Sequence, residues 1–402
     1  MILMDMPKDI FPQKTVIAVK RCIALNIPFA LLMMPGSDET KFYASTSTTG
    51  SPVTHDGYFR DGVAIGFFAE DPEKAIYIPA ELNEDDIIAM PSAMESLSQT
   101  TAILPATATS FIPYYSIVRD LIEQHKYIGG KTVFSRVIKV DTSVPIVTVA
   151  ARYFSQMRTA FRFLYFTPDS GLWLGATPEL LYQWNSKNHD FQTMALAGTR
   201  RLRTSDLSVS WDSKNKEEHE YVSRFILDSL NELGIKAKSD ILEDNSLSFG
   251  TIEHICRRFY GKTKVAPAKV IEKLNPTPAV CGWPVEIALK NILENEPHDR
   301  NCYAGFISVC EGSDFRAYVN LRSAAIVPLT DGNCSYTIYA GGGITRKSTP
   351  INEWKEAAFK ASYLYRAATE GSTIPFVPVK ELLTTTLEKE IDEAIGSKTL
   401  NT

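Results

Sequence analysis

The chain has 402 residues, of which 44% are hydrophobic and 22% charged, and 42 basic against 47 acidic residues give it a formal net charge of −5. This composition is ordinary for a folded globular protein and excludes a disordered chain, a collagen-like repeat and a small disulfide scaffold. The mild acidity argues against a nucleic-acid-binding protein and makes an anionic substrate unexpected. The length allows two or three domains, or one large α+β domain.

Cysteine usage and hydropathy indicate a cytoplasmic protein. The six cysteines are scattered and include no C-x-x-C pair, so we expect reduced thiols and neither a disulfide framework nor a zinc site. Charged residues at positions 5, 8 and 9 interrupt any signal-peptide-like apolar run. The longest uncharged stretch, residues 96–118, is rich in Ser and Thr and contains two prolines, so no membrane span is expected.

The first half of the chain predicts mixed secondary structure. Residues 1–110 combine short apolar runs with turn residues, which predicts a strand-rich lobe with one early helix. A helix over 116–130 ends at paired glycines, and a strand over 132–140 follows it directly. A further helix is expected over 151–163.

The second half predicts a hairpin and two long helices. Residues 171–199 contain two strand-like runs, LLYQW and FQTMALAG, joined by the polar turn NSKNHD. Long helices are expected over about 214–233 and 351–370. Residues 371–402 predict a C-terminal tail with one helix that carries no obvious chemistry.

Glu218 lies in line with a hydrophobic stripe. The helix over 214–233 has apolar residues at positions 222, 226, 230 and 233, and Glu218 precedes them by one turn on the same face. Because burying an unpaired charge is costly, such a carboxylate lies just beyond the core or has a strong partner. Two interpretations stay open: a solvated first-turn glutamate stabilised by the helix dipole, and a metal ligand or paired acid.

The last long helix carries three charges on one face. Thr349 and Pro350 suit its N-cap and first positions, and Glu353, Glu356 and Lys360 follow at helical spacing. Taken alone, these charges favour a solvent-exposed ion pair of little energy.

The segment before that helix shifts the balance towards a functional site. Gly341, Gly342 and Gly343 follow a strand and are expected to lead by a short loop into the helix. Successive glycines allow a close approach to a ligand and offer N–H groups to an anion. The spacing is that of neither a Walker loop nor a dinucleotide fingerprint.

Two further residues stand out. Glu179 follows a proline in LGATPELL at the start of the hairpin, where a solvated strand-end residue is the ordinary interpretation. Arg322 interrupts the apolar run VNLRSA and therefore needs an anionic partner from the protein or from a ligand. The segment NPTPAVCGWP predicts a rigid turn.

Seven motifs together resemble the chorismate-utilising enzymes. In chain order they are LGATPELL, ALAGTR, KNKEEHEYV, NPTPAVCGWP, YAGFISV, VNLRSA and YAGGGITRKSTPINEWKE. The resemblance extends from about Lys131 to Lys360 and implies a single α+β domain in which two sheets flank a central active-site cleft, with helices packed outside. Together with the pattern along the chain, this predicts an N-terminal strand-rich lobe of the same domain (1–110), a chorismate-binding catalytic core (111–370) and a C-terminal tail (371–402).

The resemblance also implies chorismate as substrate and Mg²⁺ as cofactor. Glu218 and Glu356 match the family's metal ligands, with Glu353 nearby in support, and oxygen ligands are those that Mg²⁺ prefers. Glu179 matches the general acid that protonates the departing hydroxyl at ring carbon 4. Lys131 matches the general base for water that attacks ring carbon 2.

Other positions match the family's substrate-binding residues. His254 matches the histidine near the departing hydroxyl, with a core histidine of purely structural role as the alternative. The residues that would hold the substrate carboxylates or line the ring are Arg322, Lys360, Tyr303, Gly341, Gly342, Gly343, Gly198 and Thr199.

Two positions discriminate within the family. Lys131 favours water over ammonia as nucleophile, so no glutaminase partner is expected, and Ala197 stands where aminodeoxychorismate synthases carry a nucleophilic lysine. The resemblance therefore favours an isochorismate synthase, an isomerase that serves menaquinone or siderophore synthesis as a monomer or weak dimer. A salicylate synthase, an enzyme like anthranilate synthase component I and a non-catalytic chorismate-binding protein are the alternatives.

Overall fold

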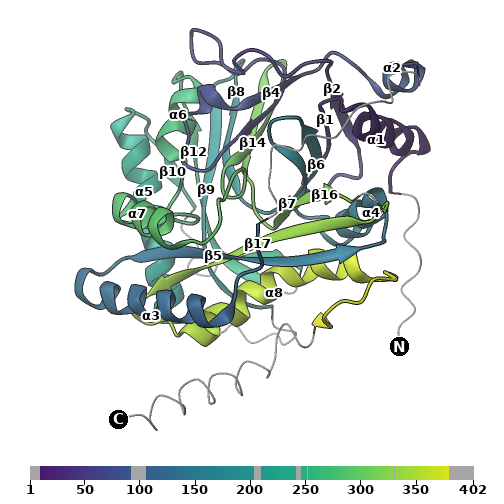
Figure 1. The fold of residues 1–402 in the computed structure, drawn as a ribbon. Helices are drawn as coiled ribbons and strands as arrows, with labels where there is room; N and C mark the ends of the chain where they lie inside the picture. The colour runs from purple at the N-terminus through teal and green to yellow at the C-terminus, as the bar shows by residue number, and fades with distance from the viewer. Residues whose placement is uncertain are drawn as a thin grey trace.

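Two antiparallel sheets form the centre of the protein, as the computed structural model in Figure 1 shows. The structure describes residues 10–91, 106–202, 210–240, 246–250, 252–329 and 331–379. The helix predicted in the C-terminal tail therefore falls mostly outside the described residues.

The first sheet has eight strands in the order β13-β5-β17-β16-β7-β6-β1-β2. Its longest strands, β5 and β17, pair over their whole length and cross the middle of Figure 1. The strands are β13 (Gly282–Trp283), β5 (Lys131–Thr142), β17 (Cys334–Thr345), β16 (Ser323–Pro328), β7 (Gly171–Thr177), β6 (Phe161–Thr167), β1 (Phe29–Met33) and β2 (Lys41–Ala44).

The second sheet has nine strands, eight of them in the order β10-β12-β9-β8-β15-β14-β3-β4, with β11 paired to β12 beside this path. The strands are β10 (Lys238–Ser239), β11 (Ser246–Phe249), β12 (Ile252–Lys262), β9 (Asp190–Arg201), β8 (Leu180–Asn185), β15 (Asp314–Val319), β14 (Phe306–Glu311), β3 (Gly62–Gly66) and β4 (Ile76–Pro79).

Helices cover the sheets from outside. α8 runs along β5 and β17 with α3 and α4 against it, whereas α5 and α6 pack on the second sheet (Figure 1). This mixed architecture confirms the predicted α+β class. The helices are α1 (Gln13–Leu25), α2 (Glu84–Ala89), α3 (Phe111–Ile128), α4 (Ile146–Gln156), α5 (Ser213–Glu232), α6 (Pro267–Leu274), α7 (Val285–Asn295) and α8 (Pro350–Thr369), and Pro72–Lys74 forms a 3₁₀ turn.

Most of the first sheet is buried on both faces, and β1, β6 and β7 are buried along their whole length. On the inner face Phe161 stacks on Tyr318 of the second sheet, with ring centroids 4.2 Å apart. On the outer face Leu164 and Tyr336 belong to a second apolar cluster that includes residues of α1, α4 and α8. Because side chains alternate between the two faces of a strand, this sheet contributes residues to two hydrophobic cores, one on each face.

The N-terminal residues contribute strands to both sheets. β1 and β2 extend the first sheet beyond β6, and β3 and β4 extend the second beyond β14. Two short helical elements accompany α1 in this part of the chain, where one helix was expected. The boundaries at residues 110 and 370 stay predictions.

The chain around residues 151–170 corrects one prediction. A helix was expected over 151–163, but α4 ends at Gln156 and β6 begins at Phe161. No glycine or proline separates the two elements, and the buried Arg162, which donates to the carbonyl of Phe154, breaks the apolar pattern of the strand. The predicted hairpin is correct, with β8 and β9 on either side of the polar turn.

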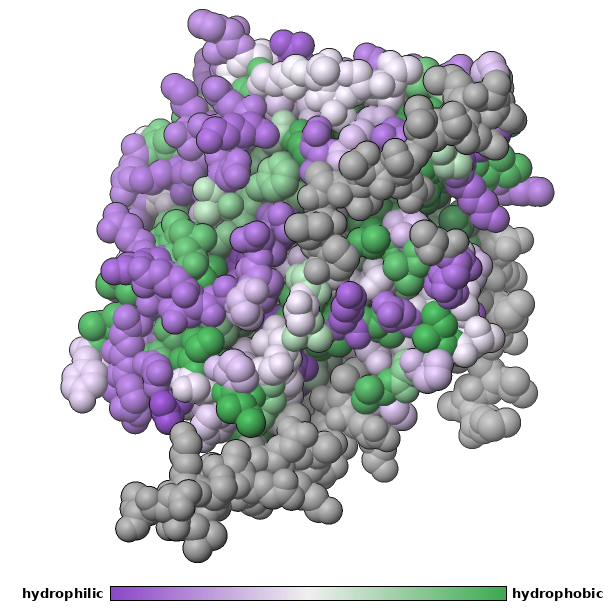
Figure 2. Space-filling model, viewed as in Figure 1, coloured by the Kyte–Doolittle hydropathy of each residue, from purple (hydrophilic) through white to green (hydrophobic). Residues whose placement is uncertain are grey.

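The surface agrees with the modest net charge. Figure 2 shows polar residues interspersed with small apolar patches over the visible face. Within the described ranges, no helix has the length and apolar character needed to cross a membrane.

Candidate active site

A pocket with about 700 Å³ of space, part of it open to solvent, collects most of the predicted substrate-site residues. It lies where β17 of the first sheet meets β9 and β12 of the second. The predicted residues that line it are Glu179, Gly198, Thr199, Glu218, His254, Tyr303, Arg322, Gly341, Gly342, Gly343 and Lys360. Lys131, Glu353 and Glu356 lie outside this lining. Lys131 pairs with Glu218 and Glu356 pairs with Lys360, both of which line the pocket, whereas Glu353 pairs with Lys214, which does not.

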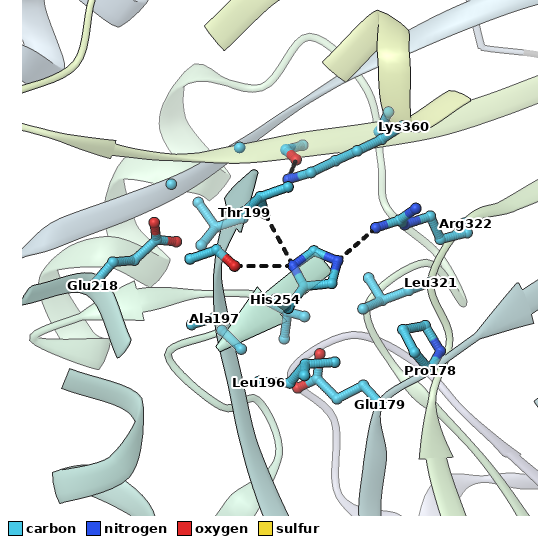
Figure 3. Close-up of a pocket in the computed structure, with 18 of the residues that line it drawn as sticks. Pro178, Glu179, Leu196, Ala197, Thr199, Glu218, His254, Leu321, Arg322 and Lys360 are labelled. Atoms are coloured by element: carbon cyan, nitrogen blue, oxygen red, sulfur yellow. Dashed lines mark hydrogen bonds between the residues drawn. The ribbon is translucent and has the colours of Figure 1, made fainter. Parts of the chain in front are cut away.

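His254 stands at the centre of the pocket, between Thr199 and Arg322 (Figure 3). Its Nε2 lies 2.9 Å from a guanidinium nitrogen of Arg322, and its Nδ1 lies 3.0 Å from Oγ1 of Thr199 and 3.1 Å from the carbonyl of Gly198. Because a guanidinium only donates, Nε2 must accept and Nδ1 must carry the hydrogen. Burial, with Arg322 and Lys360 nearby, holds the pKa of His254 well below its usual range.

Arg322 projects into the pocket from a strained backbone. Its φ is +52°, a conformation that is uncommon for residues other than glycine. The buried hydroxyl of Tyr153 on α4 donates to the Arg322 carbonyl at 2.9 Å. The guanidinium also lies 4.4 Å from the centre of the Phe249 ring. Arg322 is thus held from both its backbone and its side chain.

Gly198 and Thr199 are fixed by the start of α5. Gly198 has φ +75°, and a Cβ at this position would lie 3.0 Å from the carbonyl of Asn215. The side-chain oxygen of Asn215 accepts the Thr199 N–H at 2.9 Å, while its amide group donates to Asp212 at 2.6 Å. The amide side chain therefore satisfies a donor and an acceptor at once, which a carboxylate could not do.

Glu179 is buried at the lower side of the pocket in Figure 3. Only 3% of the residue is exposed, so the interpretation as a solvated strand-end residue is wrong. Burial raises the pKa of Glu179 to about 8, although Lys131 and a bond with Thr277 act in the opposite direction. At neutral pH the carboxyl is protonated and can donate a proton.

Lys131 is completely buried and pairs with Glu218. Its Nζ lies 3.1 Å from Oε1 of Glu218, whose side chain is 14% exposed and faces the pocket. Glu218, the carboxylate in line with the apolar stripe of α5, thus has a charged partner, which agrees with the interpretation as a paired acid. The interpretation of Glu218 as a freely solvated residue is wrong.

The three glycines belong to strand β17 itself, whereas the prediction placed them after a strand. The predicted short loop into the helix lies between the end of β17 and Pro350. The backbone of the glycines pairs with β5 on one side, whereas the register with β16 ends at Ile338. A Cβ at Gly343 would lie 2.5 Å from Oε1 of Glu218, and a Cβ at Gly342 would lie 2.7 Å from Oε2 of Glu353. Glycine at these positions leaves room for the two carboxylates beside the strand.

The sequence matches the protein family described as chorismate binding enzyme over residues 82–369. The chain belongs to this family. It is 30% identical over 304 residues to the chloroplastic isochorismate synthase of Catharanthus roseus, covering 69% of this chain and 51% of the relative. It is 28% identical over 247 residues to the isochorismate synthase EntC of Escherichia coli, covering 58% of this chain and 60% of the relative.

A solved structure has the same fold. The structure of MenF, described as the menaquinone-specific isochorismate synthase from Escherichia coli, superposes with a TM-score of 0.68 at 20% identity and covers 89% of this chain and 91% of that chain. The chain spans between half and two thirds of the length of the two relatives named above.

The carboxylates predicted to bind Mg²⁺ pair with lysines in this structure. Glu353 is 1% exposed and its Oε1 lies 2.7 Å from Nζ of Lys214, while Glu356 lies 2.8 Å from Nζ of Lys360. Burial and the neighbouring Glu356 raise the pKa of Glu353 to about 6. Burial would raise the pKa of Glu356 as well, but Lys360 and Lys214 lower it overall.

These positions fit a hard divalent cation by their chemistry. All three candidates are carboxylates, and Oε2 of Glu353 is buried without a hydrogen-bond partner. A set of acids that repel one another and leave an oxygen unpaired suits an ion of double positive charge. Within the described part of the chain, no three acidic, histidine or cysteine side chains already converge as a cage, so the carboxylates would have to move together to hold an ion.

Sequence reasoning missed several residues that support the pocket. Arg300 on the loop after α7 donates to the carbonyls of Val133 at 2.7 Å and Val280 at 2.8 Å, both of which line the pocket, and pairs with the buried Glu296. Tyr153 is a further example. Neither residue could be recognised from its neighbours in the sequence, because the carbonyls that accept from Tyr153 and Arg300 belong to distant parts of the chain. Lys214 did carry a signal: it is a cation in the first turn of a helix, where the dipole disfavours it.

Proposed function

We propose that the protein is an isochorismate synthase, an isomerase that converts chorismate into isochorismate. Water adds at ring carbon 2, the double bonds shift, and the hydroxyl at ring carbon 4 leaves as water, so the overall composition is unchanged. The observation that carries this proposal is the buried Glu179, a carboxyl whose raised pKa of about 8 keeps it protonated at neutral pH, in a pocket that it lines together with Arg322 and Lys360.

Glu179 has the protonation state that a general acid needs. With a pKa of about 8 it holds its proton at neutral pH and can give it to the departing hydroxyl. Lys131, buried on β5 and within electrostatic reach of Glu179, would take the proton of the attacking water. For the next turnover the proton returns from the lysine to the carboxylate through solvent, which restores both groups.

The pocket also suits a substrate that carries two carboxylates. Arg322 and Lys360 both line it, and the planar Arg322 group can bind a carboxylate through two parallel hydrogen bonds. The Nζ of Lys360 already donates to the carbonyl of Gly341 at 2.9 Å, which fixes its direction. Tyr303 and Tyr339 also line the pocket and stack on each other with ring centroids 5.2 Å apart, which limits the movement of both rings.

Glu218, Glu353 and Glu356 would hold Mg²⁺, and the bound ion would supply a positive charge for a substrate carboxylate. This assignment is supported by the all-oxygen chemistry of the three side chains and by the unpaired Oε2 of Glu353. The pathway, menaquinone or siderophore synthesis, and a cytoplasmic location without nucleic-acid, membrane or glutaminase partners remain part of the proposal.

Incubation of the purified protein with chorismate and Mg²⁺, followed by chromatographic identification of the products, tests the proposal. Isochorismate alone is the expected product. Salicylate with pyruvate would identify a salicylate synthase, and anthranilate after addition of ammonium would indicate an anthranilate synthase-like enzyme. Unchanged chorismate, with binding seen by calorimetry, would indicate a binding protein. Lys131→Ala and Glu179→Gln serve as matched inactive controls for the catalytic groups.

A further inference from the structure

We define the carboxylate cluster as Glu218, Glu353 and Glu356. One of the lysines paired with this cluster has no proposed role. Each member of the cluster has a lysine partner, and two of these partners have proposed roles as base or in substrate binding. The third is Lys214, whose Nζ lies 2.7 Å from Oε1 of Glu353. It does not line the substrate pocket.

The position of Lys214 in α5 is unfavourable unless acids surround it. It is the second residue of a helix whose N-cap is Asp212, and the positive end of the helix dipole disfavours a cation there. Its side chain is 26% exposed, so part of its hydration is lost as well. Burial would lower the pKa of Lys214, but Glu353, Glu356 and Glu218 outweigh it and raise the pKa. All three carboxylates therefore act on one ammonium group.

Lys214 satisfies Glu353 only in part. One carboxylate oxygen receives the ammonium group, while the other, Oε2, is buried against the strand at Gly342 without a hydrogen-bond partner. A buried carboxylate with one free oxygen is costly, and a divalent ion held there would compensate it better than a single ammonium group.

We propose that Lys214 is a built-in counter-cation that stabilises the carboxylate cluster when no divalent ion is bound and that lowers the affinity of the cluster for Mg²⁺. This inference rests on the proposed function, because it requires the cluster to be the metal site. An ammonium group and Mg²⁺ repel each other and compete for the same carboxylate oxygens. Metal binding must therefore release the bond between Lys214 and Glu353.

Direct metal binding tests the proposal without any measurement of activity. The variant Lys214→Met replaces all of the side chain except the terminal ammonium group by atoms of similar size and so removes the charge. Lys216→Met is the matched control, because Lys216 is exposed on the same helix two residues away. Each protein is stripped with a chelator and titrated calorimetrically with Mg²⁺ in the absence of chorismate, and its Tm is measured with and without Mg²⁺.

We expect Lys214→Met to bind Mg²⁺ about tenfold more tightly than the wild type, because one positive charge next to the ion is removed. Its metal-free Tm should fall by about 2 °C or more, and Mg²⁺ should restore it. Lys216→Met should match the wild type in both measurements. Equal or weaker Mg²⁺ binding by Lys214→Met, with normal binding by the wild type, would overturn the inference alone.

Other outcomes separate the inference from the proposed function. Absence of Mg²⁺ binding by every variant would refute the metal assignment and the inference together. Binding by Lys214→Met but not by the wild type would support the inference and exclude Mg²⁺ as a cofactor of the natural protein. If Lys214→Met does not fold, Lys214→Arg replaces it: this variant keeps the charge, so tighter Mg²⁺ binding than in the wild type would contradict the inference.

Discussion

The Nε2 atom of His254 lies 2.9 Å from a guanidinium nitrogen of Arg322 and can only accept a hydrogen bond there. The other ring nitrogen therefore carries the hydrogen and donates towards Gly198 and Thr199. The imidazole is a neutral spacer that ties β12 to β9 and to the loop bearing Arg322. His254 and Arg322 both line the pocket, so the hydrogen bond between them lies at the site, and a contact of the histidine with the substrate stays a prediction.

His254→Ala should weaken substrate binding more than turnover. Without its acceptor the Arg322 guanidinium can turn away from the pocket, and we expect KM for chorismate to rise about tenfold. Because His254 stays neutral, the pH dependence of kcat/KM near pH 6.5 should be the same in the wild type and in the variant. Steady-state kinetics across pH check both statements. A pH step lost with the histidine would show that it titrates during catalysis.

Glu179→Gln should abolish most turnover while leaving binding intact. The amide keeps the shape of the carboxyl but has no acidic proton, so kcat should fall by about 10²-fold or more. In the wild type, kcat/KM should decline as pH rises through about 8, because the acid loses its proton there. A variant with near-normal kcat, or a wild type whose activity rises above pH 8, would refute the assignment of Glu179 as the acid.

The same carboxyl should make stability depend on pH. Its folded pKa of about 8 lies above the value of an unfolded glutamate, so between the two the unfolded chain has released a proton that the folded chain retains. The stabilising contribution of Glu179 is therefore complete below the unfolded pKa and is lost as pH rises towards 8. Glu179→Gln removes this loss, and its Tm relative to the wild type should increase from pH 5 to pH 8. A constant Tm difference would contradict the raised pKa.

The sequence predicted the α+β class, the hairpin and most of the pocket residues, because motifs and hydrophobic periodicity are local signals. The prediction failed where pairing with strands distant in the sequence determines the secondary structure. The helix predicted over 151–163 ignores the pairing of β6 with β1 and β7, which extends the chain from Phe161 onward. The prediction that Gly341–Gly343 follow a strand ignores their pairing with β5, which keeps these residues within β17. The partners of Arg322 and Glu353 lie far apart in sequence and have no motif.

Tyr153→Phe should weaken substrate binding through a backbone contact. The Tyr153 hydroxyl donates to the carbonyl of Arg322, whose φ of +52° needs support from its surroundings. Removing one hydroxyl keeps the packing of the ring and should raise KM for chorismate about fivefold with little change in kcat. Kinetics with Tyr336→Phe, which removes another buried hydroxyl that has no hydrogen-bond partner, provide the control. Equal effects of the two variants would indicate a general loss of stability.

Gly343→Ala should damage the site while preserving the fold. The added methyl group would lie 2.5 Å from Oε1 of Glu218, the free end of a side chain that can move away, so the strand itself need not shift. The displaced carboxylate would lose its bond with Lys131. We expect the affinity for Mg²⁺ and the turnover to fall about tenfold or more, and the rise in Tm on addition of Mg²⁺ to become smaller. Gly341→Ala is the contrasting variant, because its methyl group would press on the backbone of β5 at 3.1 Å and should lower Tm. Calorimetric Mg²⁺ titration and thermal denaturation of both variants distinguish the two effects. A Gly343→Ala protein with unchanged Mg²⁺ affinity would show that Glu218 is not a metal ligand.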